Sequence, residues 1–204
     1  GVYIALAIGL NVVVGYAGLL DLGYVAFFAI GGYAMAVFGT MWGWNFWEIL
    51  VVGVLLTSVS GLILGAPALR LRGDYLAIVT LGFGEIVRIS AQNTDAIGGP
   101  RGIAGIPHPP TLSEFEIFGI KPLRYGLLDP RPYYYLLVFL IVLTIIFVKR
   151  LEKSRVGRAW GAIREDEDAA ELMGVPTFRY KLAAFAIGAA VGGAVGVVWA
   201  GKVI

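Results

Sequence analysis

Five long stretches of this sequence contain no charged side chain, and this feature limits the folds open to the chain. The stretches are residues 1–20, 22–47, 49–69, 133–148 and 182–201. Roughly 20 apolar residues cross the hydrocarbon core of a bilayer as a helix, so most stretches are long enough to span a membrane. The buried core of a soluble protein explains one such stretch but not five. We therefore predict an all-α, polytopic bundle of transmembrane helices.

The composition of the whole chain points the same way. Of its 204 residues, 58% are hydrophobic and 15% are charged, whereas soluble domains are about half apolar and a quarter charged. The absence of cysteine excludes disulfides, thiolate metal sites and cysteine nucleophiles. The first residues show neither the basic segment nor the cleavage site of a signal peptide. We expect residues 1–204 to be a single transmembrane domain that is truncated at both ends.

About six membrane segments are predicted, and their connections should alternate between the two sides of the membrane. One side collects Arg70, Arg72 and eight basic residues between Lys149 and Lys181, while the other side has few. Because Lys and Arg accumulate on the cytoplasmic side, we place loop 150–176 in the cytoplasm and loop 93–132 outside. The six predicted segments are residues 1–16, 22–40, 48–69, 74–92, 133–149 and 177–201.

Two charged residues lie inside the fourth predicted segment. Glu85 and Arg88 are three positions apart, so they share one helix face and can pair. Glu85 lies about 17 Å along the helix from Asp74, near the middle of the bilayer, where a charge must face protein or water. The pair either lines a translocation path or forms a structural ion pair. Asn11, in the first segment, is a further candidate for the path, although a packing contact explains it more simply.

Small residues recur in the last segment, and other local patterns do not indicate chemistry. Gly188, Gly192 and Gly196 form a row that would let another helix pack closely. Residues 196–202 match a phosphate-binding loop up to its lysine, but the required Ser or Thr is absent. His108 is a lone histidine between prolines and is not expected to bind a metal. No catalytic motif is present, so we expect neither an enzyme nor a bound cofactor.

The charged loop should contain an ordered helix. Ser154 can cap a helix that begins near Arg155 and runs to about Met173, and Gly174 and Pro176 would end it. The helix would be amphipathic and lie along the membrane. Its five acidic residues would be repelled by anionic lipid headgroups. We therefore expect a protein partner, rather than lipid or nucleic acid, to cover its exposed face.

The stretch SRVGRAWGAIREDEDAAELMGV closely resembles the cytoplasmic loop of permease subunits of bacterial branched-chain amino acid ABC transporters. Within it, Asp168-Ala169-Ala170 followed by Gly174 looks like the EAA---G signature of ABC importers, with Asp in first place. The resemblance extends in order over nearly the whole chain. It includes NVVVGYAGLLDLGYVAFFAIGGYAMA (11–36), LRGDYLAIVTLGFGEIVRISAQN (71–93) and GGPRGIAGI (98–106).

This resemblance implies a multi-pass subunit of the bacterial inner membrane that imports branched-chain amino acids, related amino acids or amides. It implies a second permease subunit, a periplasmic substrate-binding protein and cytoplasmic ATP-binding subunits. These last subunits would bind and hydrolyse ATP, and this chain itself would bind no cofactor. The cytoplasmic helix would dock on the ATPase and transmit its motion. The residues implied in this coupling are Arg155, Gly157, Arg158, Arg164, Asp168, Ala169, Ala170 and Gly174.

Two other function classes remain open. An ion-coupled secondary transporter would use Glu85 and Arg88 and need no ATPase. A membrane scaffold would show no substrate-dependent activity with any ATPase partner.

Overall fold

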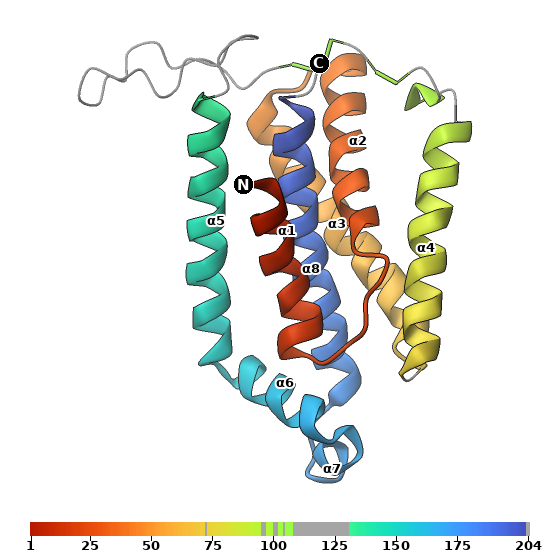
Figure 1. Cartoon of the computed structure of the whole chain (residues 1–204), viewed down its shortest axis with the longest axis vertical. Helices are drawn as coiled ribbons and strands as arrows, with labels where there is room; N and C mark the ends of the chain where they lie inside the picture. The colour runs from red at the N-terminus through yellow and green to blue at the C-terminus, as the bar shows by residue number, and fades with distance from the viewer. Residues whose placement is uncertain (72, 95–96, 100–101, 104, 108–130, 203–204) are drawn as a thin grey trace, which may run out of the picture.

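The structure is a computed structural model that describes residues 1–71, 73–94, 97–99, 102–103, 105–107 and 131–202. Within those ranges the regular elements are helices and no strand occurs. Six helical segments run side by side as a bundle (Figure 1), which confirms the predicted all-α transmembrane bundle. They are α1 (Val2–Asn11) with the π-helix η1 (Val12–Tyr16), α2 (Val25–Met41), α3 (Phe46–Ala68), α4 (Asp74–Asn93), α5 (Arg131–Glu152) and α8 (Thr177–Ala200).

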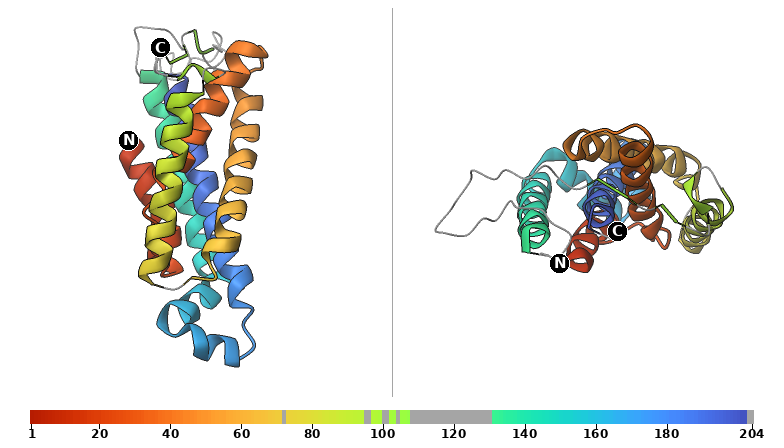
Figure 2. Two further views of the ribbon diagram at one scale, coloured as in Figure 1. Left: turned by 90° about the vertical axis from the view of Figure 1, so that its right-hand side faces the viewer. Right: turned by 90° about the horizontal axis from the view of Figure 1, so that it is seen from above.

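The six segments differ in how well they suit a bilayer. Among the described residues, α3, α5 and α8 are long and apolar enough to cross a membrane. Residues 2–16 and α2 are apolar but shorter. α4 lies at the edge of the bundle beside α2 and α3 (Figures 1 and 2), and it carries both Glu85 and Arg88. The fourth predicted segment is therefore a helix with the expected bounds, but it is the most polar of the six.

α8 forms the centre of the bundle, where it packs against α1, α2 and α3 (Figure 2, right). The small residues of this helix make the close contacts possible. A Cβ atom on Gly188 would lie 2.5 Å from a side-chain carbon of Val13, and one on Gly196 would lie 2.1 Å from the carbonyl oxygen of Phe28. Gly192 faces Phe27 and Tyr24 in the same way. The row of glycines thus faces η1 and α2.

The connections alternate between the two ends of the bundle. The turn between α3 and α4, which contains Arg70, lies at the same end as the helices of loop 150–176, whereas the turn between α2 and α3 lies at the other end (Figure 1). The predicted external loop 93–132 lies mostly outside the described residues, and His108 is among those not described.

An unwound segment, residues 17–24, connects η1 to α2. It runs back along the bundle rather than turning directly at its end (Figure 1). Gly18 has a φ of 69°, which only glycine adopts easily. The backbone of the segment packs on α4: Leu22 N–H donates to Thr80 Oγ1 at 3.0 Å, and a Cβ on Gly23 would lie 2.0 Å from the Thr80 carbonyl oxygen. Non-helical backbone at membrane depth needs such protein partners because lipid supplies none.

Candidate functional site

Loop 150–176 folds into two short helices that project from one end of the bundle (Figure 1). The first is α6 (Arg155–Glu165). Ser154 caps it, because its Oγ accepts hydrogen bonds from the backbone N–H groups of Val156, at 3.1 Å, and Gly157, at 3.5 Å. The predicted start of the helix is confirmed.

The prediction of one continuous helix up to Met173 is wrong. The chain breaks at Asp166, whose extended backbone (φ −156°, ψ 108°) ends α6 and begins α7 (Glu167–Leu172). Its carboxylate accepts a hydrogen bond from Ala169 N–H at 3.0 Å. Aspartate competes for backbone donors in this way and therefore favours helix starts over helix interiors. The four consecutive acids from Glu165 to Asp168 also disfavour a continuous helix through like-charge repulsion.

Gly174 ends α7 as predicted. It has a φ of 85°, and its N–H donates to the Glu171 carbonyl oxygen, while Val175 N–H donates to the Ala170 carbonyl oxygen. These two bonds form a Schellman motif, in which a glycine in the left-handed conformation closes the helix. The function of Gly174 within this chain is thus to turn the backbone back toward α8.

α6 is held against the transmembrane helices by packing and by two hydrogen bonds. Trp160 is 1% exposed and packs in the main hydrophobic core, and its indole N–H donates to the Tyr180 carbonyl oxygen at 2.7 Å. From the last turn of α6, Arg164 donates to the Gly15 carbonyl oxygen at 2.6 Å. Displacing α6 would therefore also displace η1 and the start of α8.

α7 is held by an ion pair at its base. Lys181 of α8 is only 3% exposed, and its ammonium group donates to the carboxylate of Glu167 at 2.5 Å. A buried ammonium without a counterion is costly, so this pair fixes the position of α7 relative to α8. Lys181 thus contributes to internal structure as well as to the positive charge of this end.

The residues implied in coupling divide into two groups. Gly157 and Ala170 contact the chain itself: a Cβ on Gly157 would lie 2.2 Å from the Glu152 carbonyl oxygen, and Ala170 is 5% exposed. Both positions are therefore occupied by contacts within the chain, and their part in coupling stays a prediction. The others have exposed side chains or backbone, namely Arg155, Arg158, Arg164, Asp168, Ala169 and Gly174.

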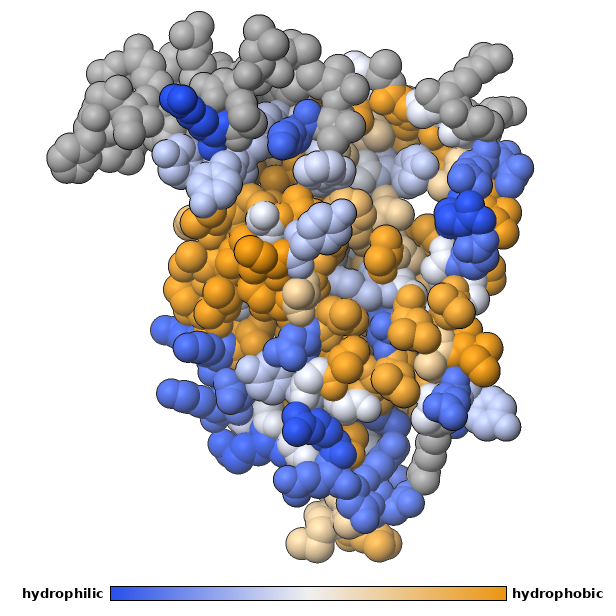
Figure 3. Space-filling model, in the orientation of Figure 1, coloured by the Kyte–Doolittle hydropathy of each residue, from blue (hydrophilic) through white to orange (hydrophobic). Residues whose placement is uncertain are grey.

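The residues that the sequence interpretation missed lie at the tip of α7. Leu172 is 89% exposed and Met173 is 85% exposed, the highest values among the large apolar side chains of α6 and α7. In Figure 3 an apolar patch projects from the hydrophilic end of the molecule. Leu172 is nine positions after Ile163, which in a helix of 3.6 residues per turn is half a turn away from it, so Leu172 would face outward even if the helix were continuous. The helical spacing of the apolar residues was the available signal.

Glu85 and Arg88 lie together on α4, whereas Asn11 is remote from them. Arg88 Nε donates to a Glu85 carboxylate oxygen at 2.9 Å, and the side chains are 57% (Arg88) and 52% (Glu85) exposed. They line a cavity of about 380 Å³ between α2 and α4. The pair lies within one helix and bridges no second helix. The exposed Asn11 side chain lies over Gly15 and does not line this cavity.

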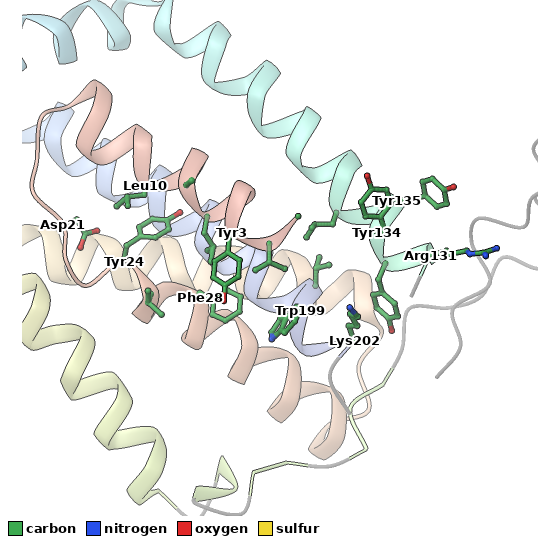
Figure 4. Close-up of a pocket in the computed structure, with 18 of the residues that line it drawn as sticks. Tyr3, Leu10, Asp21, Tyr24, Phe28, Arg131, Tyr134, Tyr135, Trp199 and Lys202 are labelled. Carbon is green, nitrogen blue, oxygen red and sulfur yellow. The ribbon is translucent and has the colours of Figure 1, made fainter. Parts of the chain in front are cut away.

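A larger open cavity, of about 1070 Å³, lies between α1, α2, α5 and α8 (Figure 4). Its walls are mainly apolar and aromatic, and include Tyr3, Phe28 and Trp199. Asp21, from the unwound segment, lies at one end, and Arg131 and Lys202 lie at the other. An apolar cavity with a few polar groups suits a small ligand.

Comparison with known proteins gives consistent results. The family described as branched-chain amino acid transport system / permease component matches residues 1–202, and this description names a transport component, not an enzyme. The chain is 45% identical to the high-affinity branched-chain amino acid transport system permease protein LivM of Escherichia coli (strain K12), over 98% of this chain and 50% of that protein. The protein of the same name from Salmonella typhimurium gives the same values.

A more distant relative is a probable branched-chain amino acid transport permease protein LivM from Methanocaldococcus jannaschii. It is 26% identical over 98% of this chain and 64% of its own length. The chain thus spans about half the length of the two bacterial relatives. No solved structure matches it.

Proposed function

The chain belongs to the family of branched-chain amino acid transport system permease components, and from this we propose that it is a transmembrane permease subunit of an ABC importer. It would move branched-chain amino acids, or related amino acids and amides, across the bacterial inner membrane. A second permease subunit would complete the pathway. A periplasmic binding protein would deliver the substrate, and separate cytoplasmic subunits would hydrolyse ATP.

The observation that supports coupling to an ATPase most directly is the attachment of α6 and α7 to the bundle. Arg164 joins α6 to η1, Trp160 joins it to Tyr180 of α8, and Glu167 joins α7 to Lys181. A force applied to these two helices reaches two transmembrane segments through direct contacts. Rigid-body movement of this kind is one way in which a bound partner changes the access of a transport path.

We place the docking contact at the tip of α7. Two large apolar side chains, Leu172 and Met173, are almost fully exposed at a polar end of the molecule. Burying such a side chain yields about 1.5–3 kcal/mol, and exposed apolar groups rimmed by charge are typical of protein contacts. The partner surface should be an apolar groove with a basic rim, because Glu171 and Asp168 flank the tip.

Uptake measured in proteoliposomes tests the proposed function. The full-length permease, its partner permease and the ATPase subunits are reconstituted, and radiolabelled leucine is supplied with the binding protein. We expect uptake that requires ATP and survives a proton uncoupler. Uptake that the uncoupler abolishes and ATP does not drive would favour the secondary transporter, with Glu85 and Arg88 as the coupling pair. The absence of uptake with all subunits present would contradict transport itself.

A further inference from the structure

Asp21 is a buried carboxylate with an unused acceptor. It lies in the unwound segment between η1 and α2 and is 4% exposed. Its Oδ1 accepts a hydrogen bond from Gly23 N–H at 2.9 Å, while Oδ2 has no hydrogen-bond partner within the part of the chain that the structure describes. A buried carboxylate oxygen without a partner is unfavourable. Such an atom is expected where a ligand supplies the missing donor.

The position of Asp21 in the bundle also favours a ligand as the missing donor. The neighbouring Leu22 bonds to Thr80, six residues into α4, or about 9 Å from the start of that helix. Asp21 therefore lies at membrane depth, where ionisable groups are rare and mark transport paths. None of the described basic side chains forms an ion pair with it.

The cavity beside Asp21 defines what kind of ligand would fit. Asp21 lies at one end of it, next to Tyr24 and Leu10, and Phe28, Tyr3 and Trp199 line the way toward Lys202 and Arg131 (Figure 4). The hydroxyl of Tyr24 donates to the Gly188 carbonyl oxygen at 2.9 Å, so it does not satisfy Asp21. A ligand seated there meets one anionic group at the Asp21 end, apolar or aromatic walls along its length, and the basic residues Arg131 and Lys202 at the other end.

We propose that the cavity is a binding site for an amino acid with an apolar side chain, whose ammonium group donates to Asp21 Oδ2. The ammonium supplies the missing donor and a compensating charge. The apolar side chain occupies the apolar walls, and the carboxylate points away from Asp21, toward the end with Arg131 and Lys202. This inference rests on the proposed function, since it assigns a substrate contact within the transport path.

A conservative substitution tests the assignment in the full-length transporter reconstituted with its partner subunits. Asp21→Asn keeps the acceptor for Gly23 N–H and removes the charge. We expect leucine uptake to fall at least tenfold, while the complex assembles in normal amounts. Asp74→Asn, which removes an exposed acid at the start of α4, is the matched control and should transport normally. Normal uptake by Asp21→Asn would overturn the inference while leaving the proposed function intact. Failure of the wild type to take up leucine would instead contradict the proposed function.

A measurement on the wild-type complex does not depend on how the variant folds. Dicyclohexylcarbodiimide modifies buried carboxyl groups, and the modification of Asp21 can be followed by mass spectrometry. We expect millimolar leucine to slow it severalfold and 4-methylpentanoate, which lacks the ammonium group, to leave it unchanged. Equal protection by both compounds, or by neither, would contradict an ammonium contact. If Asp21→Asn does not assemble, this labelling experiment decides the question alone.

Discussion

The two helices of loop 150–176 differ in what their apolar side chains contact. α6 buries Trp160 and Ile163 against the transmembrane helices, whereas α7 exposes Leu172 and Met173. Ala170, the last buried residue before Leu172 and Met173, is only seven positions after Ile163, and Asp166 divides the two helices. One helix therefore anchors the loop and the other presents a surface. Anchoring and the docking that we propose are therefore separable, and different substitutions should disturb each of them.

The largest effect is expected for Trp160, through which α6 packs on the transmembrane helices. Trp160→Ala removes a fully buried ring and its hydrogen bond to Tyr180, and we expect a loss of about 3–5 kcal/mol in the free energy of unfolding. Thermal unfolding of the purified protein in detergent measures the change. Trp160→Phe keeps most of the packing and should cost clearly less. Equal stability of the alanine variant and the wild type would show that α6 is not anchored through this residue.

The next largest effect is expected for Leu172 and Met173, the exposed residues at the end of α7. Leu172→Ala with Met173→Ala should weaken association with the ATPase subunit roughly a hundredfold, or about 2.7 kcal/mol, without changing thermal stability. The affinity is measured by titrating the ATPase subunit onto the permease in nanodiscs. Val142→Ala with Leu143→Ala, on the exposed side of α5, is the matched control. Loss of stability in the tip variant would mean that α7 also has an anchoring function.

The third prediction concerns the ion pair between Glu167 of α7 and Lys181 of α8, which holds the exposed helix α7 against the bundle. Glu167→Gln leaves the buried ammonium of Lys181 without a charged partner and should cost about 1–2 kcal/mol of stability. Adding Lys181→Met removes the unpaired charge and should restore part of the loss, as chemical unfolding of the single and double variants would reveal. A double variant less stable than the single one would contradict this explanation.

The smallest effect concerns the end of α7. Gly174→Ala places a Cβ on a residue with a φ of 85°, which costs about 1 kcal/mol. There is open space around the added atom, so the cost is conformational and not steric. We expect weaker ATPase association with little change in overall unfolding. An alanine variant with unchanged affinity for the ATPase subunit would show that docking does not depend on the backbone conformation at Gly174.

The sequence was sufficient to predict a bundle of transmembrane helices, because long uncharged stretches form few other structures. It also predicted that the helical part of loop 150–176 begins after Ser154 and ends at Gly174, where local hydrogen bonding determines the backbone. It did not reveal the break at Asp166, since a charged amphipathic pattern tolerates either one helix or two. The exposure of Leu172 does not depend on that break, because its spacing from Ile163 already places it on the opposite side of a helix.

The cavity was missed for another reason. Asp21 occurs between two apolar stretches and looks like an ordinary turn residue. Its depth depends on the unwound segment packing on Thr80 of α4, a contact between residues 58 positions apart. Hydrophobic patterns describe single segments and carry no information about such contacts. The pairing of Glu85 with Arg88, by contrast, was predicted from their spacing of three positions, because both residues belong to the same helix.

Crosslinking from the tip of α7 tests the central claim most directly. Residues 1–204 contain no cysteine, so once any cysteine elsewhere in the assembly is replaced, Leu172→Cys gives the attachment site for a benzophenone probe, and Val142→Cys gives a matched exposed site on α5. In the assembled transporter we predict that illumination joins the probe at position 172 to the ATPase subunit and leaves the probe at position 142 unattached to it. A probe at position 172 that never reaches the ATPase, in a transporter that hydrolyses ATP and takes up leucine, would contradict docking through α7.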